Sequence, residues 1–295
     1  MIRILGTIFA GLLGLAFGSF LNVCLSRWPH GESVVRPGSH CRNCDHSLAW
    51  WENVPLVSWL ALRGRCRKCG AAISWRYPLV ELAVGALWSV QAWQFLRDSS
   101  PDMFFWDVHH LFHHPELLGL QIGWAIFPWL LTALAVLDAE NLWLPDWLTL
   151  PGILLGFICT VLRTRAHYEF ERPNPPILLG GLDCLYGILI AAALILLIRW
   201  LYKLIRKREG IGLGDAKLMA MLAAWLGLPG ALLAFGLGAV IGALTALALL
   251  PTARRNSEGW AATKLPLGTF LCIGGIISSL WGQQMIGAYL RWSGL

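Results

Sequence analysis

The chain has 295 residues, of which 57% are hydrophobic and only 14% charged, and its mean hydropathy is +0.60. A soluble domain has roughly 45–50% apolar and about 25% charged residues, so these values exclude an ordinary soluble protein and indicate a polytopic membrane protein. The formal net charge is +6, but the basic residues lie in short segments between apolar runs, where they set membrane orientation. The charge therefore gives no support for nucleic acid as a partner.

Long apolar runs begin near the N-terminus and recur along the chain. The first, Ile4–Leu25, is long enough to cross a hydrocarbon core, which needs about 20 helical residues. A cleavable signal peptide is the alternative, but only Arg3 precedes the run and Arg27 follows it in place of a small-residue cleavage site. Seven further runs lie at Leu79–Leu96, Leu117–Leu137, Trp147–Leu162, Leu182–Leu201, Leu218–Leu228, Ala231–Leu250 and Leu265–Leu290.

These runs predict an all-α polytopic membrane protein with about eight transmembrane helices. The run Leu218–Leu228 is short, so Pro229 and Gly230 mark either a tight turn or a break in one longer helix. With eight crossings, most Lys and Arg residues share one side, and the positive-inside rule places both termini outside the cytoplasm. We divide the chain into a first transmembrane helix (1–26), a cytoplasmic loop (27–77), a second transmembrane helix with an extracytoplasmic loop (78–116) and a membrane domain (117–295).

The cytoplasmic loop carries two Cys-x-x-Cys pairs, formed by Cys41, Cys44, Cys66 and Cys69. Four thiolates at this spacing are typical of a structural zinc site of the zinc-ribbon type, whose metal supplies folding free energy to a small loop. The alternative is a redox pair, which the reducing cytoplasm disfavours. The other four cysteines lie in apolar runs, and we interpret them as packing residues: Cys24, Cys159, Cys184 and Cys272.

Three aspartates stand where apolar runs begin or end: Asp138, Asp146 and Asp215. Ionisable groups at membrane depth are costly and usually mark a functional site. The alternative is that Asp215 is a loop residue at the N-cap of the helix that follows it, while Lys217 extends towards the interface. The predicted topology brings all three carboxylates to the cytoplasmic face, where two of them can share a proton, so that one activates water and the other protonates a scissile carbonyl.

Other patterns in the sequence, a histidine cluster and a set of glycines, give weaker evidence for a catalytic or binding site. The cluster His109–His114 has four histidines, and we interpret it as an amphipathic surface segment on the outer side, with metal binding as the alternative. The small residues Gly236, Gly238, Gly242 and Gly274-Gly275 predict a helix-packing face. The chain has no Gly-x-Ser-x-Gly elbow, His-Glu-x-x-His pair or phosphate loop, so serine hydrolase, zincin and nucleotide hydrolase functions have no residue support.

Several further motifs accompany the cysteines and aspartates: Gly18-Ser19-Phe20-Leu21-Asn22-Val23, Trp50-Trp51-Glu52-Asn53-Val54-Pro55, Arg76-Tyr77-Pro78-Leu79-Val80-Glu81, Asp138 to Pro151, and Gly212-x-Gly214-Asp215. Together they resemble the bacterial type IV prepilin leader peptidases, which are membrane-embedded aspartic enzymes of pilus assembly and type II secretion. The resemblance extends over nearly the whole chain. The usual C-terminal motif of that family, Pro-Phe-Gly-Pro, reads Pro266-Leu267-Gly268-Thr269 here, and this departure concerns the geometry of a helix end.

The resemblance implies an inner-membrane enzyme that cuts the basic leader from type IV prepilins or type II secretion pseudopilins on the cytoplasmic side. It also implies methylation of the new N-terminus with S-adenosylmethionine. Asp138 and Asp215 match the catalytic dyad, and Asp146 is the alternate partner. Because the leaders are basic, we consider three acidic residues as contacts or, alternatively, as structural residues, namely Glu52, Glu81 and Glu140. Neither the S-adenosylmethionine site nor the oligomeric state is predicted.

Two other classes of function fit part of the pattern. A proton-coupled transporter would also use intramembrane aspartates, but such proteins usually show repeated halves, and this chain has no visible internal repeat. A non-enzymatic zinc-bearing assembly factor would explain the cysteines but gives Asp138 and Asp215 no role. We therefore expect a membrane peptidase whose partners are a prepilin-like substrate and membrane lipid.

Overall fold

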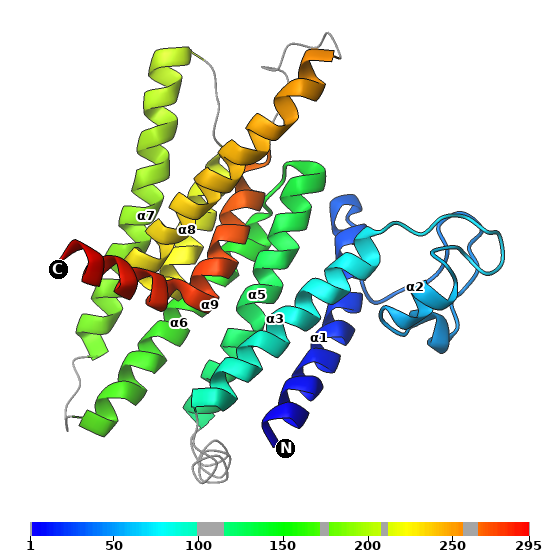
Figure 1. Ribbon diagram of the computed structural model, residues 1–295, viewed down its shortest axis with the longest axis horizontal. Coiled ribbons are helices and arrows are strands. Elements are labelled where there is room, and N and C mark those ends of the chain that lie inside the picture. Colours follow the sequence, from blue (N-terminus) through cyan, green and yellow to red (C-terminus); the bar gives the residue numbers. More distant parts are fainter. Residues whose placement is uncertain (1, 99–114, 172–176, 208–211, 256–264, 295) are drawn as a thin grey trace. The chain divides into compact units, whose positions relative to one another are not determined.

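The computed structural model describes residues 2–98, 115–171, 177–207, 212–255 and 265–294 (Figure 1). Within these ranges the elements are α1 (Ile2–Arg27), η1 (Trp28–His30), η2 (Trp50–Asn53), α2 (Val57–Ala61), α3 (Arg76–Asp98), α5 (Pro115–Asn141), α6 (Asp146–Glu171), α7 (Ile177–Arg206), α8 (Leu213–Arg255) and α9 (Leu267–Ser293). The described residues contain no β-strand beyond two isolated bridges in the cysteine loop. The predicted cluster His109–His114 lies outside the described residues.

Among the described residues, seven helices are long and apolar enough to cross a membrane, which confirms the predicted all-α membrane fold. Two of the eight predicted runs lie within one element, α8, which is broken at Gly227. This residue has φ 71° and ψ 170°, a conformation that glycine adopts readily and that interrupts the helix. The break lies two residues before Pro229, where the sequence predicted a turn or a break.

The two parts of α8 run in opposite directions along α9. Two contacts define the first part: Asp215 lies near Cys272, and Leu222 packs against Gly275. Two more define the second part: Ser278 Oγ donates to the carbonyl oxygen of Gly230 at 2.8 Å, and Phe270 packs against Gly242. Along the first part of α8, contacts at higher residue numbers fall at higher residue numbers of α9, so the two run parallel. Along the second part they fall at lower residue numbers of α9, so the two run antiparallel. The element α8 is therefore a helical hairpin. All eight predicted apolar segments therefore exist as separate helical segments.

The chain divides into two compact units, Met1–His110 and Leu111–Leu295. In the first unit, α1 packs antiparallel to α3 through small residues. A Cβ atom added to Gly14 would lie 2.9 Å from the Cα of Gly85, and one added to Gly18 would lie 2.7 Å from the Cα of Glu81. Such close approach of two helix backbones through glycine is typical of helix pairs in membranes.

In the second unit, α9 packs against both α5 and α8, and α6 and α7 also contact α8 (Figure 1). Trp225 of α8 stacks on Phe127 of α5, with ring centroids 4.8 Å apart, and its Nε1 donates to the carbonyl oxygen of Gly152 in α6 at 2.9 Å. The predicted glycine face is formed in part, because Gly238 packs against Phe270, while a Cβ atom added to Gly236 would have no neighbouring side chain or helix within 4 Å. This core holds together the helix ends that carry the aspartates.

Candidate active site and metal centre

Asp138 lies in the last turn of α5, and only 6% of it is exposed. Its Oδ2 accepts hydrogen bonds from the backbone N–H of Thr269 at 2.7 Å and from the Thr269 hydroxyl at 3.2 Å, and the carboxylate also accepts the N–H of Gly268. These donors belong to the first turn of α9, where the N-cap residue Pro266 makes no side-chain cap. The Asp138 carboxylate thus caps α9 from a neighbouring helix, and the positive end of the helix dipole stabilises negative charge there.

Asp215 is the third residue of α8, and only 7% of it is exposed. Its Oδ2 accepts the backbone N–H of Gly212 at 3.0 Å. Gly212 immediately precedes the helix, so this bond is the half of a capping box in which a side chain reaches back to the N-cap backbone. The sequence alternative of Asp215 as the N-cap residue is therefore wrong in position, because Asp215 is the third helical residue and caps by reaching back to Gly212, and the same carboxylate has a second set of neighbours.

Asp138 and Asp215 come together at the meeting point of three helix ends. Their carboxylates are close enough to interact electrostatically, and both interact with Cys272 of α9. Cys272 is fully buried, so the two carboxylates face an interior that excludes water on that side. Two buried like charges repel each other strongly, and a helix cap alone does not require such a pair.

Leu144 and two glycines pack closely around this pair. A Cβ atom added to Gly268 would lie 2.9 Å from both the Asp138 Oδ2 atom and the Leu144 Cδ1 atom. A Cβ atom added to Gly214 would lie 3.0 Å from the Cβ of Leu144. Leu144, in the connection between α5 and α6, therefore fits between the starts of α8 and α9 because both carry glycine where it passes.

Asp146 lies apart from the buried pair. Helix α5 ends at Asn141, Leu142 has a left-handed φ of 52°, and Asp146 begins the next helix, α6. The Asp146 side chain is 59% exposed, and its Oδ1 forms an ion pair with the Nζ of Lys217 at 2.6 Å. Exposed ion pairs contribute little to stability, about 0–1 kcal/mol. The structure thus brings Asp138 and Asp215 together and leaves the alternate carboxylate at the surface.

The four loop cysteines converge in the first unit. The Sγ atoms of Cys41, Cys44, Cys66 and Cys69 all lie within 4.8 Å of one another, and those of Cys41 and Cys69 are 3.8 Å apart. A tetrahedral zinc site with Zn–S bonds of about 2.3 Å places its sulfur atoms about 3.8 Å apart. A disulfide needs about 2.05 Å, so this geometry suits a metal and not a redox bond.

Matching backbone turns present the two halves of this cluster. In the first half, the backbone N–H of Cys41 donates to the carbonyl oxygen of His46, and the Cys41 carbonyl oxygen accepts the N–H of Asp45. In the second half, the backbone N–H of Cys66 donates to the carbonyl oxygen of Ala71, and the Cys66 carbonyl oxygen accepts the N–H of Gly70. Hydrogen bonds from the Ala71 backbone N–H and the Asn43 amide lower the pKa of the Cys69 thiol to about 6. A thiolate is the form that binds zinc, and the convergence of four sulfur atoms is the feature that fits the cluster to hold the predicted structural ion.

Two of the acidic candidates for leader contact are buried and bound to backbone. Glu52 accepts the N–H of Ala49 at 2.8 Å, and Glu81 accepts the N–H of Leu56 at 2.8 Å together with the Ser19 hydroxyl. Their burial favours the structural alternative for both residues. Glu140 lies exposed in the last turn of α5.

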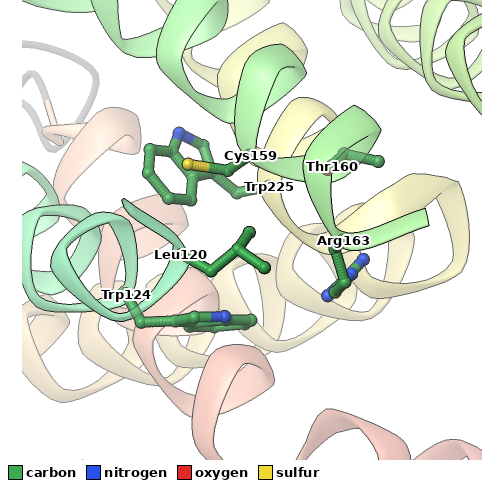
Figure 2. Close-up of a pocket in the computed structure, with 6 residues that line it drawn as sticks. All are labelled: Leu120, Trp124, Cys159, Thr160, Arg163 and Trp225. Carbon is green, nitrogen blue, oxygen red and sulfur yellow. The ribbon is translucent and has the colours of Figure 1, made fainter. Parts of the chain in front are cut away.

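A small pocket lies in the second unit between α5, α6 and α8 (Figure 2). Its lining residues are Leu120, Trp124, Cys159, Thr160, Arg163 and Trp225. None of the three aspartates lines it, and Thr160 and Arg163 lie towards the end of α6 opposite Asp146. The aspartate pair, and not this pocket, is the candidate active site.

Sequence reasoning missed Thr269, Leu144 and the position of Cys272. The departure from the usual family motif at Thr269 is a signal for the first, although it does not show which group the hydroxyl meets. Leu144 has no such signal, because its role depends on how two distant glycines approach it. Cys272 reads as an ordinary packing residue, and it is one, but it packs beside two carboxylates.

Comparison with known proteins gives matches along the chain. Residues 12–95 match the family described as the bacterial peptidase A24 N-terminal domain, and residues 125–247 match the type IV leader peptidase family. A prepilin leader peptidase/N-methyltransferase of Stutzerimonas stutzeri is 35% identical over 96% of this chain and 93% of the relative. The enzyme of that name from Pseudomonas aeruginosa has the same identity and coverage, and that from Xanthomonas campestris pv. campestris is 32% identical over 99% and 96%. No solved structure matches the chain.

Proposed function

The chain belongs to the type IV leader peptidase family of multi-pass inner-membrane proteins, and we propose that it cleaves the leader peptide from type IV prepilins or type II secretion pseudopilins on the cytoplasmic side. The observation that carries this proposal is the meeting of Asp138 and Asp215 at the ends of α5 and α8. Relatives that cover almost the whole chain are named prepilin leader peptidases, which supports the substrate class. The basic segments between the helices support the cytoplasmic orientation of this site, with both termini on the opposite side.

In peptide hydrolysis, one of the two carboxylates can act as general base and the other as general acid. Because both cannot ionise cheaply at close range, the pair holds one proton between them. The ionised member accepts a proton from the attacking water, and the protonated member donates its proton to the carbonyl oxygen of the scissile bond. The donors at Gly212 and Thr269 hold the two carboxylates in position, since each ties one Oδ2 atom to a helix start. Asp146 takes no part in this scheme.

We extend the proposal to methylation of the newly formed N-terminus. The support is the printed name of the relatives, which joins leader peptidase with N-methyltransferase. S-adenosylmethionine would supply the methyl group. Zinc, held by the four loop thiolates, would stabilise the loop and would not act in hydrolysis, because four cysteine ligands leave no coordination position for water.

The test is cleavage by purified protein in lipid vesicles that also hold a purified prepilin. Wild-type protein should release the leader, which mass spectrometry of the mature N-terminus would detect, whereas Asp138→Asn and Asp215→Asn should leave almost all of the prepilin uncut. A pH-sensitive dye inside the vesicles reports proton transport in the same preparation. Correctly inserted wild-type protein that moves protons and leaves the prepilin uncut would overturn the proposal in favour of a transporter.

A further inference from the structure

The short helix α2 in the cysteine loop presents apolar side chains that the protein does not cover. Val57 and Leu60 of α2 are each more than half exposed, and so are Trp75 and Leu79 at the start of α3. Val57 and Leu60 are three residues apart and so share one helix face. Exposed apolar side chains that share a helix face mark a surface that contacts a partner or a membrane.

Hydrogen bonding fixes α2 at the depth of the second turn of α3. The backbone N–H of Leu56, the residue before α2, donates to the Oε2 of Glu81 at 2.8 Å. Glu81 in turn packs against Gly18 of α1, seven residues before the end of the apolar run at Leu25. At 1.5 Å per helical residue, the start of α2 lies about 10 Å inside the end of that run. Interfacial helices bury their apolar face roughly 5–10 Å into the boundary between lipid headgroups and acyl chains, so this depth fits the apolar face of such a helix.

Other contacts hold α2 in a fixed orientation. The indole N–H of Trp59 donates to the carbonyl oxygen of Ile73 at 3.3 Å, and the Trp59 ring lies 4.2 Å from that of Trp75 between centroids. Leu56 adopts φ 60° and ψ −49°, a strained backbone conformation that aims its N–H at Glu81. Trp59 therefore anchors the inner face of α2, and Leu60 is left on the outer face.

The charge around α2 suits an anionic surface. Residues 54–76 contain five basic and no acidic side chains, and those that directly follow α2 are exposed, namely Arg63, Arg65, Arg67 and Lys68. A four-thiolate zinc site carries negative charge, but the loop 27–77 stays positive with it, because it holds eight basic and three acidic residues. Basic residues beside an apolar, tryptophan-bearing helix are typical of binding to anionic lipid.

We propose that α2 and Trp75 lie in the lipid–water interface of the same membrane that α1 and α3 cross, with the basic residues after α2 on anionic headgroups. The occupant of the exposed apolar face is therefore lipid. A basic peptide would be repelled by the same charges that attract these headgroups. This inference rests on the first unit alone and does not depend on the proposed peptidase activity.

The test replaces Leu60 with a photoreactive, diazirine-bearing analogue of leucine in the full-length, zinc-loaded protein. The matched control carries the analogue at Leu62, a half-buried leucine two residues on, which a helix places on the opposite side. Both proteins are placed in vesicles of phosphatidylethanolamine with phosphatidylglycerol, irradiated and examined by mass spectrometry. We expect lipid adducts at position 60 in several-fold excess over position 62, and fewer at position 60 when phosphatidylcholine alone forms the vesicle.

Two outcomes would overturn the inference. Addition of water in place of lipid at position 60 would show that α2 faces solvent, and a cross-link to a second copy of the chain would show a protein interface. A second variant tests whether the hydrogen bond between Leu56 and Glu81 holds α2 at the membrane. Glu81→Leu removes the oxygen atoms that accept the Leu56 N–H, and it should reduce the lipid adducts at position 60 while α1 and α3 stay inserted. Unchanged adducts in Glu81→Leu would show that the hydrogen bond between Leu56 and Glu81 does not hold α2 in place.

Discussion

The Asp138 carboxylate accepts two hydrogen bonds from one residue, Thr269, through its backbone N–H and its hydroxyl. The hydroxyl also lies 2.9 Å from the carbonyl oxygen of Ala135, so its single proton is shared between two acceptors. The usual family motif has proline at this position, and proline has no N–H and no hydroxyl to donate. In this chain the first turn of α9 thus holds the candidate catalytic carboxylate with donors that the usual motif lacks.

Removal of the Thr269 hydroxyl should slow cleavage without preventing it. We expect Thr269→Val to lower kcat by about tenfold, because a hydrogen bond to a charged group contributes about 1.5–3 kcal/mol and this one is shared. Thr269→Ser keeps the hydroxyl and should retain most of the activity, and KM should change little in either variant. Steady-state cleavage of prepilin in vesicles measures both constants. Equal rates in the valine and serine variants would show that the hydroxyl does not position Asp138.

The buried pair should behave as one unit. Asp138→Asn, Asp215→Asn and the double variant should all reduce cleavage to the same residual rate, because each removes one member of a shared-proton pair. Asp146→Asn is the matched control, and it should keep at least part of the activity, since its carboxylate is exposed and paired with Lys217. The activities of these variants are measured as initial rates of prepilin cleavage, normalised to the amount of inserted protein. An inactive Asp146→Asn beside an active Asp138→Asn would show that the pair has been assigned wrongly.

Much of this arrangement could be predicted because it depends on local sequence. Apolar runs gave the helical segments, and the aspartates at the run ends gave the candidate pair. The choice between Asp138 and Asp146 was harder, since both border the same connection. The structure separates them because Leu142 takes a left-handed backbone and Asp146 starts a new helix beside Lys217.

The parts that could not be predicted depend on contacts between distant residues. Glycine at position 227 is compatible with several backbone conformations, so the reversal of α8 is visible only from its opposite registers along α9. Glu52 and Glu81 looked available to a basic leader, but backbone N–H groups of the loop already bind them. The partner of Glu81, Leu56, lies 25 residues away in the sequence and has no signal there, whereas Ala49 lies three residues before Glu52 with the spacing of a capping box.

A methyl group at Gly268 should disturb the active site directly. The added Cβ would lie 2.9 Å from Asp138 Oδ2 and from Leu144 Cδ1, which is closer than real Cβ contacts. We expect Gly268→Ala to lower cleavage on the order of tenfold or more, because small displacements of a catalytic group are costly. Gly236→Ala is the control, since nothing lies within 4 Å of its added Cβ. If both alanine variants cleave prepilin at the wild-type rate, the close packing around Asp138 is not needed for catalysis.

Loss of one zinc ligand should disrupt the structure of the loop, and prepilin cleavage should fall only as a consequence of that disruption. Cys44→Ser should lower the zinc content of the purified protein, which we expect at about one ion per chain in the wild type, because a structural site needs all four thiolates. The loop 27–77 should then become sensitive to protease, and cleavage of prepilin should fall through loss of loop structure. Cys159→Ser is the control, because that cysteine lies in α6 of the second unit and is not one of the four clustered cysteines. Metal analysis and limited proteolysis under reducing conditions measure both effects. Wild-type protein without zinc, or a Cys44→Ser loop as resistant to protease as the wild type, would show that the cluster is not a structural metal site.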